Sequence, residues 1–452
     1  MAKPTQRRAS TQVDGTSGLG MVMRFTPKAS HSGVQQLEKG GFRVASSKDF
    51  RTAASVQNDF DGADVQYFER FGIAIIRRDG ERLKPMLENA VQQKIVSAVR
   101  PERSYHALGG PAAKRYDVTQ VTQGGLATMM DRDYLLGYRD GINDLVDRVL
   151  GKKGAEGARP TAAAFDETSS TWGVQAVRVL ESGMTGAGIK IAVLDTGFDD
   201  THQDFAGRAV TKKLFASRSS EDDVHGHGTH CIGTSCGPLR PTTGPRYGIA
   251  YEAEIYAGKV LGDDGFGTDR SIIAGMDWAL DQGCHIISMS LGAPTQIGDP
   301  ASDDYEQIGH VCLDAGTLVV AAAGNESSRP QLISPVGSPA NASTILAVGA
   351  VDRSFLPASF SCGGLNPGQE VDLAAPGVDI LSSLPGNNYA RWDGTSMATP
   401  HVAGVAALIA QSDPKFRGWA LWARVIQITK PLPILARDVG KGLLQAKGSG
   451  EV

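Results

Sequence analysis

From Trp172 to about Ala446, short apolar runs alternate with longer stretches of helical spacing, and this alternation most constrains the fold. Runs of this kind predict buried strands, and helices between them imply a parallel sheet covered by helices. We expect strands at 190–194, 254–260, 286–290, 318–322 and 344–348, and helices at 271–281, 304–315 and 396–411. The sequence therefore predicts an α/β domain over residues 171–452.

Residues 21–100 show a second, smaller pattern. We expect strands at 21–25, 42–45, 65–69, 72–77 and 94–99, with helices at 33–39 and 82–91. The order is close to β-α-β-β-α-β, which is typical of a ferredoxin-like α+β unit. Residues 1–20 are polar and rich in Gly and Ser, so we expect a disordered tail there.

Residues 101–170 read as a connector between the two units. Apolar residues at helical spacing predict a docking helix at 131–150. Residues 151–170 are small, polar and rich in Gly and Ala, which is typical of a linker that proteases reach.

Composition limits the partners of the chain. The 45 Lys+Arg against 49 Asp+Glu give a net charge of −4, which argues against a nucleic-acid binder. The longest apolar runs, 318–323 and 402–410, are far shorter than the ~18–20 residues of a membrane span, so we expect no membrane insertion. The first residues lack the apolar stretch of a secretory signal, which favours a cytoplasmic location or non-classical export over Sec secretion.

The chain has 5 cysteines, and no pair has the spacing of a zinc knuckle. An odd number does not imply a disulfide framework, although it leaves one or two bridges open.

Three segments carry the chemistry. IAVLDTGFD ends an apolar strand at Asp195, HGHGTHCIGT sets His227 among glycines, and DGTSMATPHVAG puts Ser396 at the start of a long apolar helix. Taken singly, each residue has an ordinary explanation as a helix cap or a hydrogen-bonded polar group. Taken together, they supply a hydroxyl nucleophile, an imidazole that takes its proton, and a carboxylate that orients the imidazole.

These segments resemble the signatures of the subtilisin-like serine proteases, or subtilases. DTG surrounds Asp195, HGTH begins at His227, GTSMATPHVAG surrounds Ser396, and the chain order Asp, His, Ser is that of the family. The resemblance runs from about Trp172 to 442–446, and Cys231 after HGTH looks like the proteinase K branch. It implies a serine endopeptidase that hydrolyses protein or peptide substrates through an acyl-enzyme, with no cofactor required.

The resemblance also implies the rest of the site. Asn325 in AAAGNES would donate its amide to the oxyanion. An extended peptide would lie between two strand edges, with a primary pocket beside it. The edges would be Ser290, Leu291 and Gly292 on one side and Gly265, Phe266 and Gly267 on the other, and the pocket would have Ala323 and Gly324 as a wall and Gly337 as its floor. A glycine floor without an acidic residue favours apolar or aromatic side chains before the cut.

Two metal sites come into question. His225, His227 and His230 have H-x-H-x-x-H spacing, but coordination would disable His227 as a base, so we do not favour zinc. Asp204 stands where many subtilases have a calcium ligand. The loop 237–248 lacks the Asn or Asp that would complete that site, so Asp204 is a weak candidate and calcium is left open as a structural ion.

Residues 21–100 would then be a prosegment that assists folding and inhibits its own protease, so we expect a self-processing zymogen. Our candidate cut is Phe165–Asp166, because Phe165 suits an apolar pocket. Three alternatives remain: a maturation protease of narrow substrate range, a non-catalytic binding module on this scaffold, and a metal-dependent hydrolase that uses the histidine cluster.

Overall fold

The computed structural model describes residues 19–27, 29–50, 62–77, 90, 93–110, 165–217 and 219–446. The expected helix at 131–150, nearly all of that at 82–91, most of the expected tail and the linker up to residue 164 lie outside the described residues.

A seven-stranded sheet forms the centre of the larger domain, in the order β15-β14-β13-β11-β7-β9-β8. All neighbouring strands in it are parallel. The strands are β7 (Lys190–Asp195), β8 (Val210–Leu214), β9 (Glu254–Lys259), β11 (Ile286–Met289), β13 (Leu318–Ala322), β14 (Leu346–Val351) and β15 (Leu373–Pro376). The predicted α/β class, a parallel sheet covered by helices, is confirmed.

Helices cover both faces of this sheet, which explains why its strands are apolar throughout rather than alternating. Along β7, Ile191 and Val193 belong to one buried cluster, whereas Ala192 and Leu194 belong to another. The first cluster includes residues of α6 (His227–Cys236) and α9 (Thr395–Ser412), and the second includes residues of α7 (Asp269–Asp281) and α8 (Asp303–Asp314).

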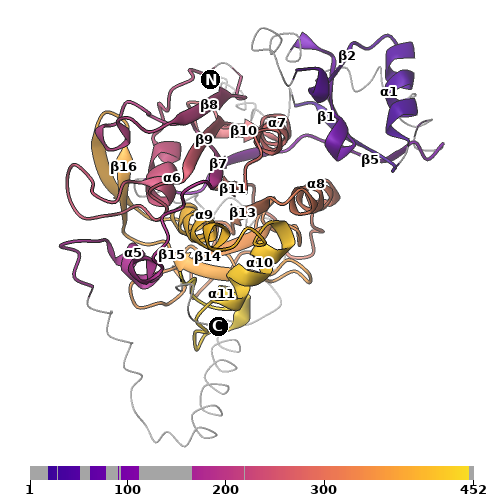
Figure 1. Ribbon diagram of the computed structural model, residues 1–452. Coiled ribbons are helices and arrows are strands. Elements are labelled where there is room, and N and C mark those ends of the chain that lie inside the picture. The colour runs from indigo at the N-terminus through magenta and orange to yellow at the C-terminus, as the bar shows by residue number, and fades with distance from the viewer. Residues whose placement is uncertain are drawn as a thin grey trace, which may run out of the picture.

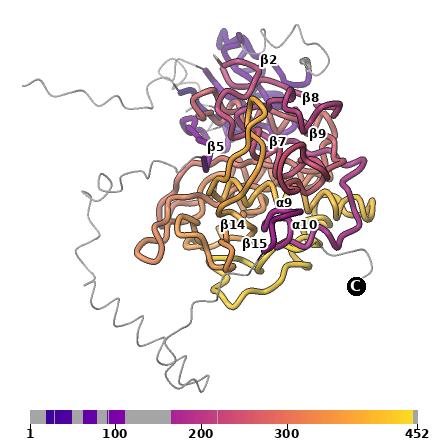
Figure 2. The backbone as a smooth tube through the Cα atoms, turned by 90° about the vertical axis from the view of Figure 1, so that its left-hand side faces the viewer, coloured from indigo at the N-terminus to yellow at the C-terminus, as the bar shows by residue number. Residues whose placement is uncertain are grey.

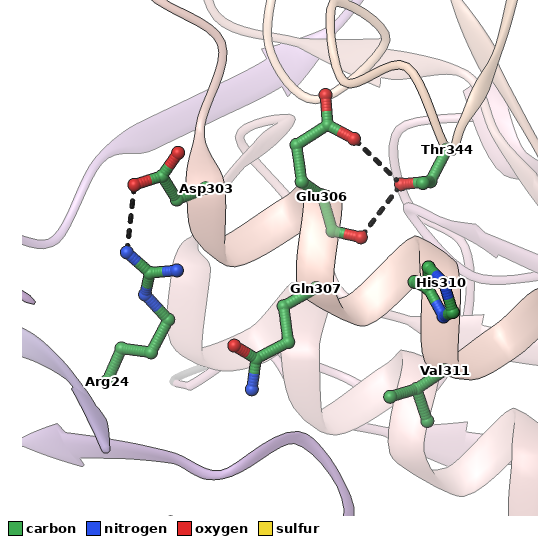
Figure 3. A pocket seen from close by; sticks show the side chains of 7 residues that line it. All are labelled: Arg24, Asp303, Glu306, Gln307, His310, Val311 and Thr344. Atoms are coloured by element: carbon green, nitrogen blue, oxygen red, sulfur yellow. Dashed lines mark hydrogen bonds and ion pairs between the residues drawn. The ribbon is translucent and has the colours of Figure 1, made fainter. Parts of the chain in front are cut away.

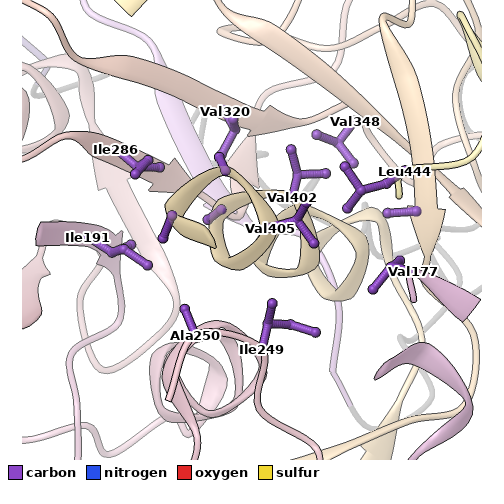
Figure 4. Packing of buried hydrophobic residues seen from close by; sticks show 14 of the residues in the cluster. Val177, Ile191, Ile249, Ala250, Ile286, Val320, Val348, Val402, Val405 and Leu444 are labelled. Carbon is purple, nitrogen blue, oxygen red and sulfur yellow. The ribbon is translucent and has the colours of Figure 1, made fainter. Parts of the chain in front are cut away.

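Helix α9 passes through the middle of the first core. Residues 395–410 are all buried, as expected for a helix that is apolar on every side. Val402 and Val405 lie among side chains that reach in from the sheet, including Ile286 and Val348 (Figure 4). This packing fixes the N-terminus of α9, and therefore Ser396, relative to the ends of the strands.

The remaining elements of the larger domain lie around this framework. They are α5 (Trp172–Ala176), α10 (Gly418–Gln427), α11 (Ala436–Val439), the antiparallel hairpin of β16 (Ile380–Leu384) and β17 (Asn388–Trp392), and the 3-10 turns Val179–Glu181 and Gln203–Phe205. No helix among the described residues has both the length and the apolar character needed to cross a membrane.

The N-terminal unit is a five-stranded sheet in the order β2-β3-β4-β1-β5. Its elements are β1 (Met21–Phe25), α1 (Ser30–Lys39), β2 (Val44–Ser46), β3 (Val65–Phe68), β4 (Ile73–Ile76) and β5 (Val96–Pro101), with 3-10 turns at Ser47–Phe50 and Glu69–Phe71. Leu37 of α1 packs with Phe25 and Tyr67. The unit is a small α+β fold, in agreement with the sequence.

This unit docks on the larger domain where α7 and α8 lie (Figure 1). Phe71, Ile73 and Ile75 share a buried cluster with Ile272 of α7 and Ile308 of α8. In the view turned by 90°, the indigo unit lies at the top, at one end of the larger domain (Figure 2).

One strand differs from expectation. Residues 104–107, placed in the connector by the sequence, form β6 (Ser104–Ala107) between β10 (Phe266–Thr268) and β12 (Leu291–Gly292). Both pairings are antiparallel. The tetrapeptide SYHA has no strand pattern of its own, and it is extended because two exposed strand edges pair with its backbone.

Candidate active site

The three motif residues lie at the ends of elements that converge. Asp195 is the last residue of β7, His227 the first of α6, and Ser396 the second of α9. The carboxyl ends of parallel strands are the place where open α/β sheets bind ligands. The fold therefore brings together residues that are far apart in the sequence.

Asp195 and His227 form a buried pair. Nδ1 of His227 donates to Oδ1 of Asp195 at 2.7 Å, and the same oxygen accepts from the amide of Thr196 at 2.7 Å. Because Nδ1 is the donor, Nε2 of the neutral ring keeps its lone pair and can accept a proton.

The charge of this pair sets the basicity of the imidazole. Burial, the largest single effect, disfavours the charged ring, but the charge and the hydrogen bond of Asp195 act with Cys231 against it, and the pKa of His227 is raised well above 6.5. Cys231, buried behind the ring with Sγ 3.9 Å from Nδ1, adds to the rise in the pKa of His227.

A further carboxylate, Asp223, ties the two supporting loops together. Its Oδ1 accepts from Oγ1 of Thr196 and from the amide of Gly226, both at 2.8 Å. Its Oδ2 accepts from the amide and the hydroxyl of Thr229 at 2.8 and 2.7 Å. Asp223 thus links the residue after Asp195 to both sides of His227. We did not single it out from the sequence, where the only signal is its place just before the histidine motif.

The hydroxyl of Ser396 is bonded to a backbone carbonyl and not to His227. Its Oγ donates to the carbonyl oxygen of Ser290 at 2.9 Å, and Nε2 of His227 has no hydrogen-bond partner among the described residues. The bond between nucleophile and base is therefore not made in this arrangement, and such bonds often tighten only during reaction.

A peptide carbonyl of the chain itself lies in front of Ser396. The amide of Ser396 donates to the carbonyl oxygen of Leu108 at 3.2 Å. A Cβ built on Gly109 would stand 3.4 Å from Cβ of Ser396, so the Leu108–Gly109 bond lies beside the hydroxyl-bearing carbon.

Asn325 completes the surroundings of that carbonyl. Its Oδ1 accepts from the amide and the hydroxyl of Thr395 at 2.9 and 2.8 Å, which fixes the orientation of the side chain. A Cβ built on Gly394 would lie 2.6 Å from the Leu108 oxygen and 3.3 Å from Nδ2 of Asn325. Nδ2 of Asn325 and the carbonyl oxygen of Leu108 therefore lie on either side of the same small space beside Gly394.

The predicted cleft edges hold β6 between them. Leu108 and Ala107 donate their amides to the carbonyl oxygens of Ser290 at 3.3 Å and Gly265 at 3.1 Å. The register pairs Ala107 with Leu291, His106 with Gly292 and Phe266, and Tyr105 with Gly267. All six predicted edge residues thus contact this segment.

Leu108, the residue before the Leu108–Gly109 bond, is buried and lies against Gly292. Leu108 is 3% exposed, and a Cβ on Gly292 would stand 2.7 Å from its Cδ1. Gly337 donates its amide to Ala323 at 2.9 Å, and Gly324 donates to the hydroxyl of Thr395 at 3.2 Å. The first bond joins the predicted floor to the predicted wall, and the second joins the wall to the start of α9.

Phe165, our candidate for the residue before the cut, is placed elsewhere. Its ring packs on Trp172 at 5.8 Å and on Phe355 at 6.1 Å between ring centroids. The segment between the predicted cleft edges is 104–108, and the cut at Phe165–Asp166 stays a prediction. An apolar side chain such as Phe165 suits the protein core as well as it suits an apolar pocket, and here it packs against the core.

The three histidines do not converge on a metal. His230 stacks on Trp392, and its Nε2 lies 3.1 Å from the carbonyl oxygen of Ile380. Burial lowers the pKa of His230 to about 3. The potential ligands that do lie together among the described residues are Asp195, His227 and Cys231, two of which already pair with each other.

Asp204, the weak calcium candidate, is held by hydrogen bonds. Its Oδ1 accepts from the amide of Thr242 at 2.7 Å, and its Oδ2 accepts from the hydroxyls of Tyr247 at 2.6 Å and Tyr389 at 2.9 Å. Hydrogen-bond donors thus occupy both oxygens, and two of them come from loop 237–248. The residues present do not fit a calcium ion, which needs several free oxygens.

All five cysteines are buried and free, so none of the bridges that the sequence left open is formed.

Charged pairs fasten the N-terminal unit to α7 and α8. Arg24 pairs with Asp303 at 2.8 Å, Arg70 with Asp281 at 2.6 Å, and Arg100 with Asp269 at 2.7 Å. A hollow of about 420 Å³ lies along this seam, between Arg24 and side chains of α8 (Figure 3). Neither Ser396 nor His227 lines this hollow.

Comparison with known proteins points to one family. Residues 186–442 match the sequence model of the Subtilase family. Subtilisin BL of Lederbergia lenta is 41% identical over 283 residues, which are 62% of this chain and 96% of that protein. Subtilisin E of Bacillus subtilis (strain 168) is 38% identical over 275 residues, which are 61% of this chain and 67% of that protein.

Proposed function

Because the chain belongs to the subtilase family and is a serine endopeptidase, we propose that Asp195, His227 and Ser396 are its catalytic triad and that it is a zymogen that cuts itself after Leu108. One observation carries the proposal: the amide of Ser396 donates to the carbonyl oxygen of Leu108. That oxygen occupies the place where negative charge would develop during attack by Ser396.

The acylation step uses groups already in place. Oγ of Ser396 attacks the carbonyl carbon of Leu108 while Nε2 of His227 takes its proton, after rotation of the hydroxyl away from Ser290. The oxyanion is stabilised by the amide of Ser396 and by Nδ2 of Asn325. His227 then gives the proton to the amine of Gly109, the carbon–nitrogen bond breaks, and an acyl-enzyme remains.

Deacylation repeats these roles with water as the nucleophile. His227 takes a proton from the water, the oxyanion forms in the same place, and the proton returns to Oγ of Ser396 as the acid leaves. Asp195 stabilises the imidazolium in both steps. The reaction needs no cofactor.

We propose that the enzyme prefers apolar residues before the cut. The buried side chain of Leu108 against Gly292 supports this preference. A deep apolar pocket discriminates by only ~1–3 kcal/mol per methylene, so the selection at this position is broad.

We further propose that residues 21–108 remain bound as an inhibitor after cleavage. β6 is hydrogen-bonded on both edges, and three arginine–aspartate pairs hold the sheet from which it extends. Until the segment leaves, the cleft stays filled. Cellular location and membership of the proteinase K branch stay predictions.

Two measurements on the full chain test the proposal. Intact mass and N-terminal sequencing of the purified protein should give a fragment that begins at Gly109, and Ser396→Ala should stay uncut. A fluorophosphonate should label the wild type on Ser396 and fail to label His227→Ala. Identical fragments from wild type and Ser396→Ala would contradict self-processing, and activity that chelators abolish without any labelling would favour a metal-dependent hydrolase.

A further inference from the structure

Tyr105, three residues before Leu108, contacts the buried carboxylate of Asp269. The hydroxyl of Tyr105 donates to Oδ1 of Asp269 at 3.0 Å. Both side chains are fully buried, and the ring of Tyr105 meets that of Tyr305 edge-on at 6.0 Å between centroids. Burial and the charge of Asp269 raise the pKa of Tyr105, so its hydroxyl remains a donor.

Every donor to this carboxylate among the described residues comes from the segment that would leave. Besides Tyr105, Arg100 donates to it at 2.7 and 3.3 Å, and the amide of Arg103 donates at 2.6 Å. Asp269 itself belongs to the protease domain, as the first residue of α7. Release of the segment therefore leaves a carboxylate without these partners at the wall of the cleft.

From this we propose that Asp269 makes the processed enzyme select a tyrosine as the fourth residue before the cut, through a hydrogen bond from the phenol to its carboxylate. The inference rests on the proposed function, because it takes β6 as the pattern for a substrate. It concerns a different position from the apolar pocket that holds Leu108.

The physical reason lies in the cost of covering a carboxylate. A tyrosine ring would fill the space beside Tyr305 and give Asp269 one of its lost hydrogen bonds. A phenylalanine ring would bury the same area but strip water from the charge without replacing it, which costs more than a normal hydrogen bond returns. Apolar burial alone would favour phenylalanine, so the two explanations predict opposite orders.

The test compares two peptides with the fully processed wild-type enzyme. They are X-His-Ala-Leu-p-nitroanilides with X as Tyr or Phe, where His-Ala-Leu repeats residues 106–108. We expect kcat/KM to be on the order of tenfold higher for Tyr, the usual effect of a hydrogen bond to a charged group. An equal or higher value for Phe would overturn the proposal.

A pair of variants locates the effect. Asp269→Leu removes both oxygens at similar volume and should lower the Tyr/Phe ratio to one or below. Asp281→Leu, on the same helix and also paired with an arginine of the N-terminal unit, should keep the wild-type ratio. An unchanged ratio in Asp269→Leu would contradict the assignment. If Asp269→Leu does not mature, the wild-type peptide pair still decides.

Failure of the proposed function looks different. In that case neither peptide is hydrolysed and a fluorophosphonate does not label Ser396, and the inference falls with its premise. Hydrolysis of both peptides at equal kcat/KM, with labelling, retains the protease and rejects only the role of Asp269.

Discussion

The side chain of Leu108 lies so close to Gly292 that a Cβ on the glycine would stand 2.7 Å from Cδ1 of the leucine. Gly292→Ala should therefore shorten the pocket for the residue before the cut. We expect kcat/KM for a Leu peptide to fall about tenfold or more relative to wild type, and that for an Ala peptide to change little. Equal losses for both peptides would indicate a damaged cleft rather than a smaller pocket.

Asn325→Asp tests the proposed oxyanion donor. The aspartate keeps an oxygen for the amide and hydroxyl of Thr395, but it replaces the Nδ2 donor with a negative charge. We expect kcat to fall by about 10²–10³, a size established for this donor in a subtilisin, while KM stays nearly constant. A normal kcat would remove Asn325 from the mechanism.

Much of this arrangement was predictable from the sequence, because strong periodicity and dense motifs are local properties. The strand expected at 318–322 is β13, and the helix expected at 396–411 is α9 with one more residue at each end. The three motif segments fall at the ends of β7, α6 and α9, where the sheet topology brings them together.

The rest depended on partners distant in the sequence. β6 is a strand only because β10 and β12 flank it, and no pattern in residues 104–107 indicates this. Asp204 was a weak calcium candidate by resemblance, whereas its hydrogen bonds from Tyr247 and the distant Tyr389 depend on the folded chain. Asp223 was overlooked because an aspartate in a polar loop has many ordinary explanations.

The pH profile should show the effect of Asp195 on His227. The imidazole acts as a base only when neutral, and its pKa is raised well above 6.5, so the neutral fraction grows only as pH rises through that higher value. We expect the acidic limb of kcat/KM to have its midpoint above pH 6.5. Asp195→Asn should move the midpoint to lower pH and reduce the maximum.

His310→Gln is the matched control for this titration, because His310 is exposed and pairs with Asp314 on the surface of α8. The midpoint of the acidic limb of kcat/KM should be the same in His310→Gln as in the wild type. A wild-type midpoint at or below 6.5 would contradict the electrostatic argument for His227.

Arg100→Ala should speed the release of the cleaved N-terminal segment. Arg100 pairs with Asp269 and Asp304, which are nearly fully buried, and its loss removes the ion pair of Asp269 and leaves Asp304 with Arg24 alone, at a cost of ~3 kcal/mol. We expect the lag before peptide hydrolysis begins to shorten by roughly 10²-fold. Arg43→Ala, which breaks an exposed pair within the segment, should keep the wild-type lag, and equal lags in all three proteins would contradict a docking role for Arg100.

Asp223→Ala should lower activity although the Asp223 carboxylate contacts supporting loops and not a substrate. Its carboxylate joins the hydroxyl of Thr196 to the amides of Gly226 and Thr229, so its loss weakens the attachment of the loop after Asp195 to the start of α6. The imidazole then spends less time in line with Ser396, and even small misplacements of this kind cost up to about 10² in kcat.

The neighbouring Asp222→Ala is the control, since its side chain is exposed and contacts Lys212. We expect Asp223→Ala to lose kcat with KM nearly unchanged and to react more slowly with a fluorophosphonate, while Asp222→Ala matches wild type. If Asp223→Ala has a lower melting temperature but a normal kcat, Asp223 stabilises the fold and does not position His227.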